Sequence, residues 1–312
     1  MTDILTVTMN PALDVSTATD TVQHTHKLRC AAALVHPGGG GINVARVVHR
    51  LGGQALALYP AGGVHGQRLQ QLLVQEQVPG QCIAIAGETR ESFAVLERRS
   101  GREFRFLLPG PLLSADEWQA CLVQVNELEP MPPYVVASGS LPPGVPDDFY
   151  VRLAGLVRER GSRLVLDTSG APLAAALAQG VYLVKPSLRE LRELTGLALP
   201  AEPDWLEAAR QIVRAGQAQV VALSLGQDGA LLVTAGQALR AAGLPVAVAS
   251  AVGAGDSFLA GLVWGLSRQL DLGQAFAQAM AAGAAAVLAP GTALCQAADV
   301  QRLAQQVHVA PA

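Results

Sequence analysis

Hydrophobic and polar residues follow two repeating patterns along the chain. Short apolar runs rich in β-branched residues predict buried strands at 4–8, 54–59, 134–137, 163–166, 182–184, 220–225 and 230–233. Apolar residues at helical spacing predict helices at 42–51, 67–77, 115–128, 147–160, 188–195 and 204–215, with another starting near residue 253. This alternation favours an α/β fold in which helices cover both faces of a largely parallel sheet.

Two regions, residues 14–36 and 88–108, interrupt the alternation with short, charged, strand-like stretches. We expect them to form a small second sheet, acting as a lid or a pairing edge. Within the second region, Ser100 and Gly101 predict the turn of a hairpin. No repeat or linker marks a domain boundary, so we expect one domain over residues 1–312.

The composition allows a large core. Of the 312 residues, 50% are hydrophobic and 15% are charged, and the net charge is −3. This balance argues against general binding of nucleic acid or of a membrane surface. The longest uncharged stretch, 272–298, is mainly Ala and Gly, too weakly apolar for a membrane span, and predicts an interior helix followed by a loop.

Cysteine usage and the first residues bear on the compartment. The four cysteines lie far apart and show no metal-binding spacing. Reduced thiols suit a reducing cytosol. The chain starts without the basic and apolar segments of a signal peptide, so we expect a cytoplasmic protein.

The segment Gly253-Ala254-Gly255-Asp256 places two glycines and a carboxylate at the start of a predicted helix. Glycine conformations let successive amides point at one anion, and the helix N-terminus adds positive potential. We therefore predict an anion site formed by the amides of these residues, with Asp256 beside it as a base. The alternative is an ordinary helix cap.

A second glycine-rich segment, Gly38 to Gly41, directly precedes another predicted helix. Four consecutive glycines are entropically unfavourable, which indicates a close approach to the backbone. Asn43 on the first helical turn is a candidate partner for a sugar hydroxyl. Asp14, six residues after the first strand, is another candidate, although a turn or capping role fits it equally.

Positive side chains gather in the two interrupting regions. Lys27, Arg29, Arg90 and Arg105 are candidates for binding a phosphate group, although exposed Arg on edge strands is also common. The chain has only two lysines, and the second, Lys185, ends a predicted strand. A compact ammonium at that position is a candidate ligand contact.

Two further segments suit a nucleotide and its metal ion. Glu190 is a candidate Mg²⁺ ligand, or alternatively the partner of Ser187 in a capping box. The segment from Ser224 to Ala230 predicts a strand, a turn and a strand that pass beneath a nucleotide, or alternatively a simple glycine turn.

Six motifs occur in order: Asn10–Asp14, Gly38–Arg46, Gly139–Gly144, Lys185-Pro186, Ser224–Gly226 and Gly253–Asp256. Together they resemble the PfkB (ribokinase-like) carbohydrate kinases, in the phosphosugar branch. The resemblance implies a three-layer α/β/α sandwich with a mostly parallel central sheet and a small β-sheet lid. It also implies ATP-dependent phosphorylation of fructose 6-phosphate in glycolysis, with fructose 1-phosphate or tagatose 6-phosphate as alternative substrates.

The resemblance also implies residue roles. Asp256 would be the base, and the amides of Gly253, Ala254 and Gly255 would hold the transferring phosphoryl group. The sugar phosphate would contact Asp14, Gly39, Asn43, Arg90, Arg105, Ser138 and Gly139, with Lys27 and Arg29 supplied by the other subunit of a homodimer. ATP would contact Lys185, Ser187, Ser224, Gly226, Gly229 and Ala254. Glu190 would support Mg²⁺, and the backbone near Val248, Ser250, Ala286 and Gly291 would hold K⁺.

The chain departs from the family pattern at two places. Ser187 replaces the usual Asn of an Asn-x-x-Glu motif, which alters the Mg²⁺ network, and Ala289-Pro290 replaces a stretch that often carries Asn. Two other functions stay open: a ribose or nucleoside kinase, disfavoured by the basic cluster, and a sugar-phosphate sensor without turnover.

Overall fold

A computed structural model describes residues 2–312 of the chain. Its main sheet has ten strands in the order β14-β13-β12-β11-β10-β9-β8-β1-β4-β5. Seven are parallel: β1 (Ile4–Val7), β4 (Ala55–Ala61), β5 (Gly80–Ala84), β8 (Tyr134–Ser138), β9 (Arg163–Asp167), β10 (Val181–Val184) and β11 (Ala218–Ser224). The antiparallel edge consists of β12 (Ala230–Thr234), β13 (Ala238–Ala241) and β14 (Val309–Pro311).

Helices cover both faces of this sheet, as the alternation predicts. One hydrophobic cluster packs α1 (Gly40–Arg50), α2 (Gly63–Gln75), α8 (Ala254–Ser267), α9 (Leu272–Ala286) and α10 (Ala297–Ala304) on one face. The other cluster packs α3 (Ala115–Asn126), α4 (Phe149–Glu159), α5 (Gly170–Gln179), α6 (Leu188–Thr195) and α7 (Glu202–Arg214) on the opposite face. The expected three-layer α/β/α sandwich is therefore confirmed.

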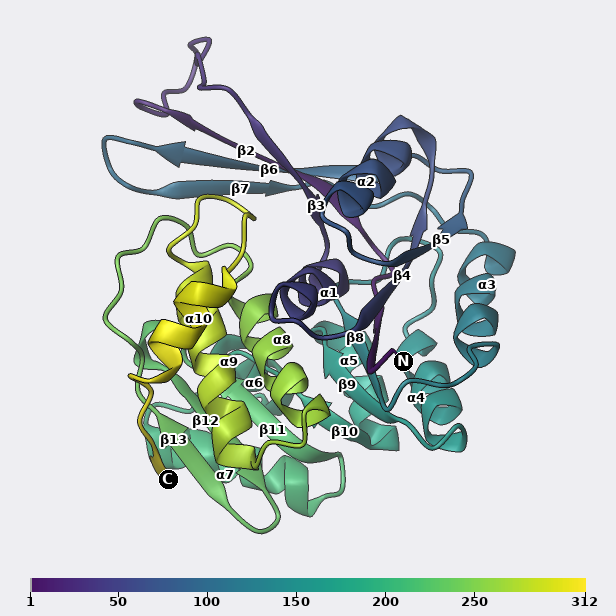
Figure 1. Cartoon of the computed structure of the whole chain (residues 1–312), viewed down its shortest axis with the longest axis vertical. Helices are drawn as coiled ribbons and strands as arrows, with labels where there is room; N and C mark the ends of the chain where they lie inside the picture. The colour runs from purple at the N-terminus through teal and green to yellow at the C-terminus, as the bar shows by residue number, and fades with distance from the viewer. Residues whose placement is uncertain (1) are drawn as a thin grey trace.

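The two interrupting regions form the expected small sheet. It comprises β2 (Ala12–Thr19), β3 (Leu34–Gly38), β6 (Arg90–Glu97) and β7 (Glu103–Leu107), in the order β3-β2-β6-β7. β6 and β7 pair as the predicted hairpin, whereas residues 20–33 form a largely exposed loop without strand structure. Figure 1 shows this sheet extending above α1 and α10.

Every expected helix and strand is present, but five elements were not expected. β5, β13 and β14 are short strands toward the two edges of the sheet, where an apolar run is not required. α5 has Pro172 in its first turn, so its start resembles a loop, and α10 is a short helix within the stretch after residue 286. The helix predicted at 67–77 begins earlier, at Gly63.

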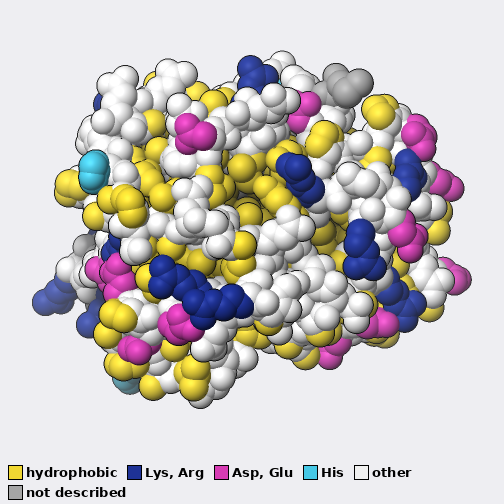
Figure 2. Space-filling model, turned by 90° about the horizontal axis from the view of Figure 1, so that it is seen from below, with side chains coloured by type: hydrophobic (Ala, Val, Ile, Leu, Met, Phe, Trp, Pro, Cys, Tyr) yellow, Lys and Arg dark blue, Asp and Glu magenta, His cyan; other side chains and the backbone are white. Residues whose placement is uncertain are grey.

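Within residues 2–312, no helix combines the length and hydropathy needed to cross a membrane. Figure 2 shows the underside of the molecule, where Lys and Arg side chains are interspersed with Asp and Glu around a largely hydrophobic centre. That face therefore has no single sign of charge.

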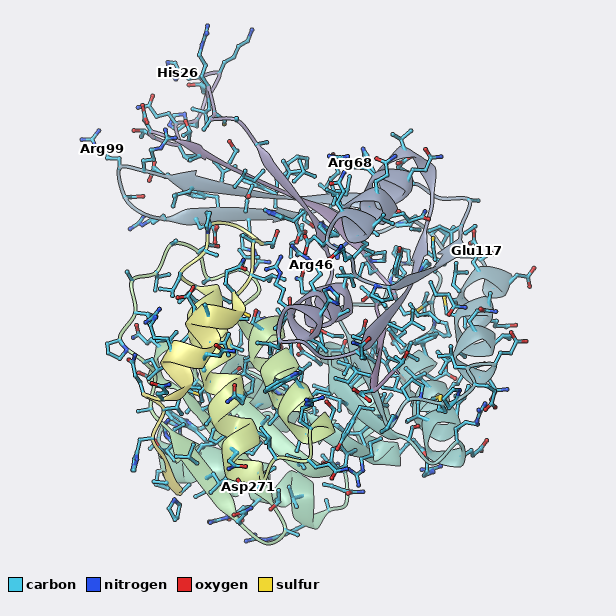
Figure 3. All side chains as sticks on the ribbon, viewed as in Figure 1. His26, Arg46, Arg68, Arg99, Glu117 and Asp271 are labelled. Carbon is cyan, nitrogen blue, oxygen red and sulfur yellow. The ribbon has the colours of Figure 1, made fainter. Side chains whose placement is uncertain are left out.

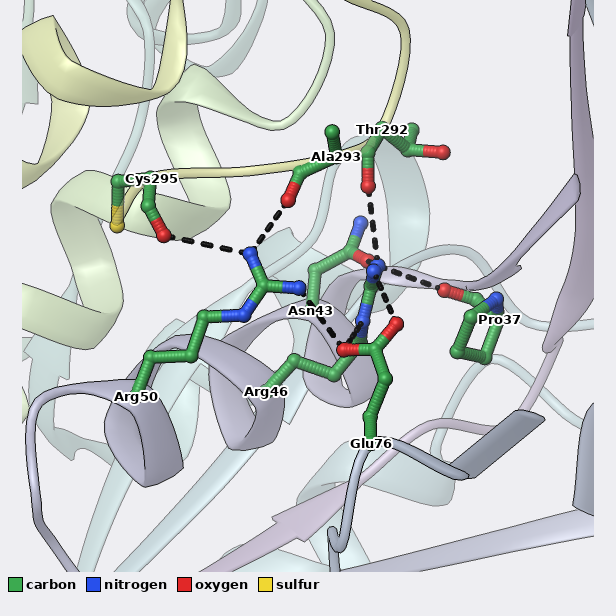
Figure 4. Close-up of polar contacts among 8 residues, drawn as sticks. All are labelled: Pro37, Asn43, Arg46, Arg50, Glu76, Thr292, Ala293 and Cys295. Atoms are coloured by element: carbon green, nitrogen blue, oxygen red, sulfur yellow. Dashed lines mark hydrogen bonds and ion pairs between the residues drawn. The ribbon is translucent and has the colours of Figure 1, made fainter. Parts of the chain in front are cut away.

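A partly buried ion-pair network joins α1, the end of α2 and the loop that precedes α10 (Figure 4). The Arg46 side chain is wholly buried and donates to both carboxylate oxygens of Glu76, at 2.9 and 2.7 Å. Arg50 donates to the same carboxylate at 2.9 Å. Arg46 also donates to the carbonyl oxygens of Pro37 and Thr292, at 2.9 and 3.2 Å. One carboxylate thus anchors two positive side chains, one of which has no access to water.

Removing this carboxylate should destabilise the fold. We expect Glu76→Ala to lower the free energy of unfolding by about 3 kcal/mol, because it leaves the buried Arg46 charge without its partner. The control is Glu207→Ala, which breaks the exposed pair with Arg214 and should cost less than about 1 kcal/mol. Urea unfolding of both variants measures the difference, and equal effects would contradict the role of the network.

The difference should also depend on pH. Burial raises the pKa of Glu76, but hydrogen bonds and charges from Arg46 and Arg50 outweigh it and hold the pKa below its ordinary value of 4.5. A depressed carboxyl pKa stabilises the folded state above the ordinary value, and that contribution disappears as the pH falls through the folded-state pKa. The difference in free energy of unfolding between the wild-type protein and Glu76→Ala should therefore become smaller at acidic pH.

Candidate active site

Most of the predicted site residues, together with Asp167, lie at or near the carboxyl ends of the parallel strands. Ser138 ends β8, Asp167 ends β9, and Lys185 follows β10 directly. Asp256 lies in the first turn of α8, and Asp14 comes from β2 of the small sheet. The site is thus formed where the main sheet, α8 and the small sheet meet.

Gly253 provides the turn into α8. Its φ of 77° is a left-handed conformation that favours glycine, and a Cβ there would overlap the Leu294 side chain. The helix begins as the amide of Ser257 donates to the carbonyl oxygen of Gly253 at 2.9 Å. The amides of the first turn have no helical acceptor, so they can point at an anion.

Asp256 does not cap this helix. Its Oδ2 instead accepts a hydrogen bond of 2.8 Å from Nδ2 of Asn43 on α1. Burial is the largest influence on Asp256 and raises its pKa, while the Asn43 hydrogen bond and the Lys185 charge act against it. A carboxylate of raised pKa held in a fixed direction is suited to accept a proton.

Lys185 and Asp167 form a buried ion pair next to the predicted anion site. Their Nζ and Oδ1 atoms lie 3.1 Å apart, and Ser138 Oγ donates to the other carboxylate oxygen at 3.3 Å. Burial raises the pKa of Asp167 to about 6, against the opposing charge of Lys185. A Cβ on Gly255 would lie 3.5 Å from Lys185 Nζ, so the ammonium borders the glycine turn.

Asp167 is not among the site residues predicted from the sequence. A signal was present, because Asp167 is a carboxylate directly after a buried apolar run, and such positions collect at the ligand edge of a parallel sheet.

A cavity of about 760 Å³ lies beside the glycine turn. Its walls include the β11–β12 turn on one side and α8 and α9 on the other. Four of the residues predicted to contact ATP line it: Ser224, Gly226, Gly229 and Ala254. Phe258, Met280 and Val287 make the opposite wall apolar, as a planar base requires.

Ser187 and Glu190 form the capping box that the sequence offered as one alternative. The amide and hydroxyl of Ser187 donate to Oε2 of Glu190 at 2.7 and 2.8 Å, and the Glu190 amide donates back at 3.2 Å. Among residues 2–312, no group of three or more His, Cys, Asp or Glu side chains is arranged to hold a metal ion. The carboxylates of Glu190 and Asp167 both act on Lys185 and so lie in one neighbourhood.

The glycine-rich segment before α1 packs closely against the sugar-site candidates. A Cβ on Gly38 would overlap the Asp14 carboxyl group, and one on Gly40 would overlap Ser138 Oγ. Gly39, at a φ of 111°, lies against Pro11 and Thr8, and Gly139 lies close to the Gly40 amide. The expected close approach to the glycine backbone is therefore made by the side chains of Asp14 and Ser138.

Asp14 is a carboxylate with a perturbed pKa at the sugar end of the site. Burial raises its pKa to about 6, and the charges of Arg46, Arg105 and Arg90 act in the opposite direction. Arg90 donates to the carbonyl oxygens of Leu108 and Asn10, each at 3.0 Å. Asp14, Arg90 and Arg105 are therefore brought together.

Lys27 and Arg29 are not brought to Asp14 within one chain. Both are exposed in the loop between β2 and β3. Figure 3 shows their neighbour His26 at the far end of the small sheet, well away from the central Arg46. Their role in phosphate binding stays a prediction that requires a second subunit.

The four residues predicted around K⁺ come from two adjoining segments. The Ala249 amide donates to the Val287 carbonyl at 2.7 Å and joins the segments. Ser250 Oγ donates to Glu103 of β7 at 2.9 Å and accepts from the Val252 amide at 3.2 Å. Val248 is exposed, Ala286 lies at the end of α9, and Gly291 backs onto Ser16 of the small sheet. The K⁺ site stays a prediction.

Because the pKa of Asp14 is raised, the ionised Asp14 carboxylate should destabilise the folded state above about pH 6. Between the ordinary value of 3.8 and about 6, the folded state binds the proton more tightly than the unfolded state, so stability falls as the pH rises. We expect Asp14→Asn to raise the free energy of unfolding at pH 8 by about 1–3 kcal/mol, and by less at pH 5. Urea unfolding at the two pH values tests this, and a loss of stability at pH 8 would contradict it.

Known proteins are similar to this chain over most of its length. The profile of the pfkB family carbohydrate kinases matches residues 8–299. The chain is 48% identical over 299 residues to the ATP-dependent 6-phosphofructokinase isozyme 2 of Mycobacterium tuberculosis strain CDC 1551, which covers 96% of this chain and 88% of the relative. It is 40% identical to the Escherichia coli isozyme 2, covering 97% and 98%, and 32% identical to the Bacillus subtilis 1-phosphofructokinase, covering 90% and 91%.

Solved structures match over almost the whole chain. The Escherichia coli phosphofructokinase-2 in complex with substrates and products superposes with a TM-score of 0.93 at 40% identity, covering 97% of this chain and 98% of that one. The same enzyme in complex with fructose-6-phosphate has a TM-score of 0.92 at 39% identity, covering 98% and 99%. The chain therefore belongs to the pfkB family of carbohydrate kinases.

Proposed function

We propose that this protein transfers the γ-phosphoryl group of ATP to the 1-hydroxyl of fructose 6-phosphate, giving fructose 1,6-bisphosphate and ADP. The observation that carries this proposal is the position of Asp256. Its carboxylate lies beside the glycine turn of α8, adjacent to a nucleotide-sized cavity and near the sugar-side carboxylate Asp14. Relatives at 40–48% identity named 6-phosphofructokinase support the choice of substrate.

In this mechanism, the Asp256 carboxylate accepts the proton of the 1-hydroxyl. The sugar oxygen then forms a bond to the γ-phosphorus, while the bond to the β–γ bridging oxygen breaks and ADP leaves. The amides of Gly253, Ala254 and Gly255 stabilise the negative charge on the transferring group. Lys185, which borders Gly255, adds a fixed positive charge. These residues need only position and stabilise, since this reaction forms no covalent enzyme intermediate.

The cavity beside the glycine turn is the proposed binding site for ATP. Its apolar wall would cover the adenine, and Ser224, Gly226 and Gly229 would lie along the nucleotide. Mg²⁺ binds few protein carboxylates together with substrate phosphates, and Asp167 and Glu190 fit that requirement. When bound, the ion would neutralise charge on the phosphates. K⁺ near Ser250 is a further proposal, supported by a potassium complex of the Escherichia coli relative.

The sugar end needs a positive group for the 6-phosphate. Arg90 and Arg105 lie beside Asp14, while Lys27 and Arg29 would come from a second subunit. We propose a homodimer formed through the small sheet, which exposes Leu34, Phe106 and Leu107. A single monomeric species in sedimentation at assay concentration would count against the dimer.

The related activity on fructose 1-phosphate is the second candidate, favoured by the Bacillus subtilis relative. The two substrates carry the existing phosphate at opposite ends of the sugar. The positions of Arg90 and Arg105 therefore decide between them.

A substrate panel tests the proposal. We expect kcat/KM with ATP to be highest for fructose 6-phosphate, lower for fructose 1-phosphate and tagatose 6-phosphate, and lowest for ribose, since an uncharged sugar leaves the basic groups without a partner. Coupled release of ADP measures each rate. A preference for ribose would contradict the assignment of the basic residues, and absence of turnover with every sugar would favour a sensor.

A further inference from the structure

Arg46 is a wholly buried positive side chain for which the proposed reaction provides no direct role. It lies on α1 among apolar neighbours, three residues after Asn43, so the two side chains share one face of the helix. Its guanidinium donates to the Asn43 Oδ1 at 3.1 Å, in addition to Glu76 and two backbone carbonyls. The guanidinium therefore connects the ion-pair network of Figure 4 to the active site.

The Asn43 amide is held at both ends. Its Nδ2 donates to Asp256 Oδ2 at 2.8 Å, and its Oδ1 accepts from Arg46 Nη1. Turning the amide over would place its NH₂ group against the guanidinium and its oxygen against the carboxylate. Both contacts would be repulsive, because Arg offers only donors and an ionised carboxylate offers only acceptors. Arg46 thus selects the orientation in which Asn43 donates to Asp256.

We propose that Arg46 is a positioning residue for the catalytic base, acting through Asn43, and that Glu76 holds Arg46 in place. This inference rests on the proposed function of Asp256 and deepens it. Asn43 would then orient the base in addition to any contact with the sugar. The hydrogen bond occupies Oδ2 of Asp256 and leaves Oδ1 for the proton of the sugar hydroxyl.

A neutral donor suits this position. Asp256 is also influenced by Lys185 after β10, by Asp14 of β2, by Arg105 of β7 and by its neighbour Asp167 at the end of β9. An amide favours the ionised carboxylate by hydrogen bonding without adding a further charge to this group. It also fixes direction, and small errors in the placement of reacting groups are costly for rate.

Arg46 has two other influences that the test must separate. Its charge acts on Asp14, and its ion pair with Glu76 supports the fold. Arg46→Lys keeps a positive charge next to Glu76. A compact ammonium lacks the planar fork that serves Glu76, Pro37 and Asn43 at once, so the Asn43 amide would lose its anchor.

The matched control is Arg50→Lys. Arg50 lies one turn later on α1, donates to the same Glu76 at 2.9 Å, and also donates to the loop carbonyls of Ala293 and Cys295, but it does not contact Asn43. We expect Arg46→Lys to lower kcat about 10-fold, with the KM for ATP unchanged. Arg50→Lys should leave kcat unchanged. Urea unfolding verifies that both variants are folded.

A double-mutant cycle tests whether Arg46 acts on Asp256 through Asn43. In an Asn43→Ala background, Arg46→Lys should cause no further loss of kcat, because the group through which it acts is gone. The same loss in both backgrounds would overturn the proposal and assign the effect to Asp14 or to packing. If Arg46→Lys does not fold, Glu76→Gln, which weakens the hold on Arg46, should give the same pattern. An active wild-type enzyme with no loss in either variant refutes only this inference, whereas an inactive wild-type enzyme refutes the proposed function.

Discussion

The site depends on keeping a carboxylate ionised in an unfavourable place. Asp256 is half-buried and lies near two other carboxylates, Asp14 and Asp167, at the place where the proposed reaction would bring phosphate groups. Burial and like charges both raise its pKa. The opposing contributions come from Lys185, from Arg105 and from the Asn43 amide. The elements that carry these groups must therefore be fixed relative to α8.

The fold provides that rigidity in two ways. The carboxyl ends of the parallel strands place Ser138, Asp167 and Lys185 side by side, while the buried pair of Arg46 and Glu76 ties α1 to α2 and to the loop before α10. Both arrangements bury charge, which contributes little net stability by itself. Their value lies in direction, because Arg46 donates to Glu76 and to two backbone carbonyls at once, and Asp167 accepts from both Lys185 and Ser138.

Much of this could be predicted from local sequence. The strands, the helices and the glycine turn before Asp256 depend on residues close together in the chain, and the small sheet was predicted from a break in the pattern. The Asn43–Asp256 contact spans 213 residues, and the Arg46–Glu76 pair joins two helices. No local pattern predicts such contacts. Asp167 was predictable in principle from its place after an apolar strand. For Ser187 and Glu190 the local sequence was ambiguous, because the same short motif fits both a metal site and a helix cap.

The role of Asp256 is the central claim, and one measurement tests it directly. Single-turnover transfer from ATP to fructose 6-phosphate should be slower in Asp256→Asn by roughly 10²–10⁴-fold, the usual contribution of a general base, while equilibrium binding of the sugar phosphate stays nearly unchanged. Transfer at the wild-type rate in that variant would contradict the account and reduce Asp256 to a structural residue at the start of α8.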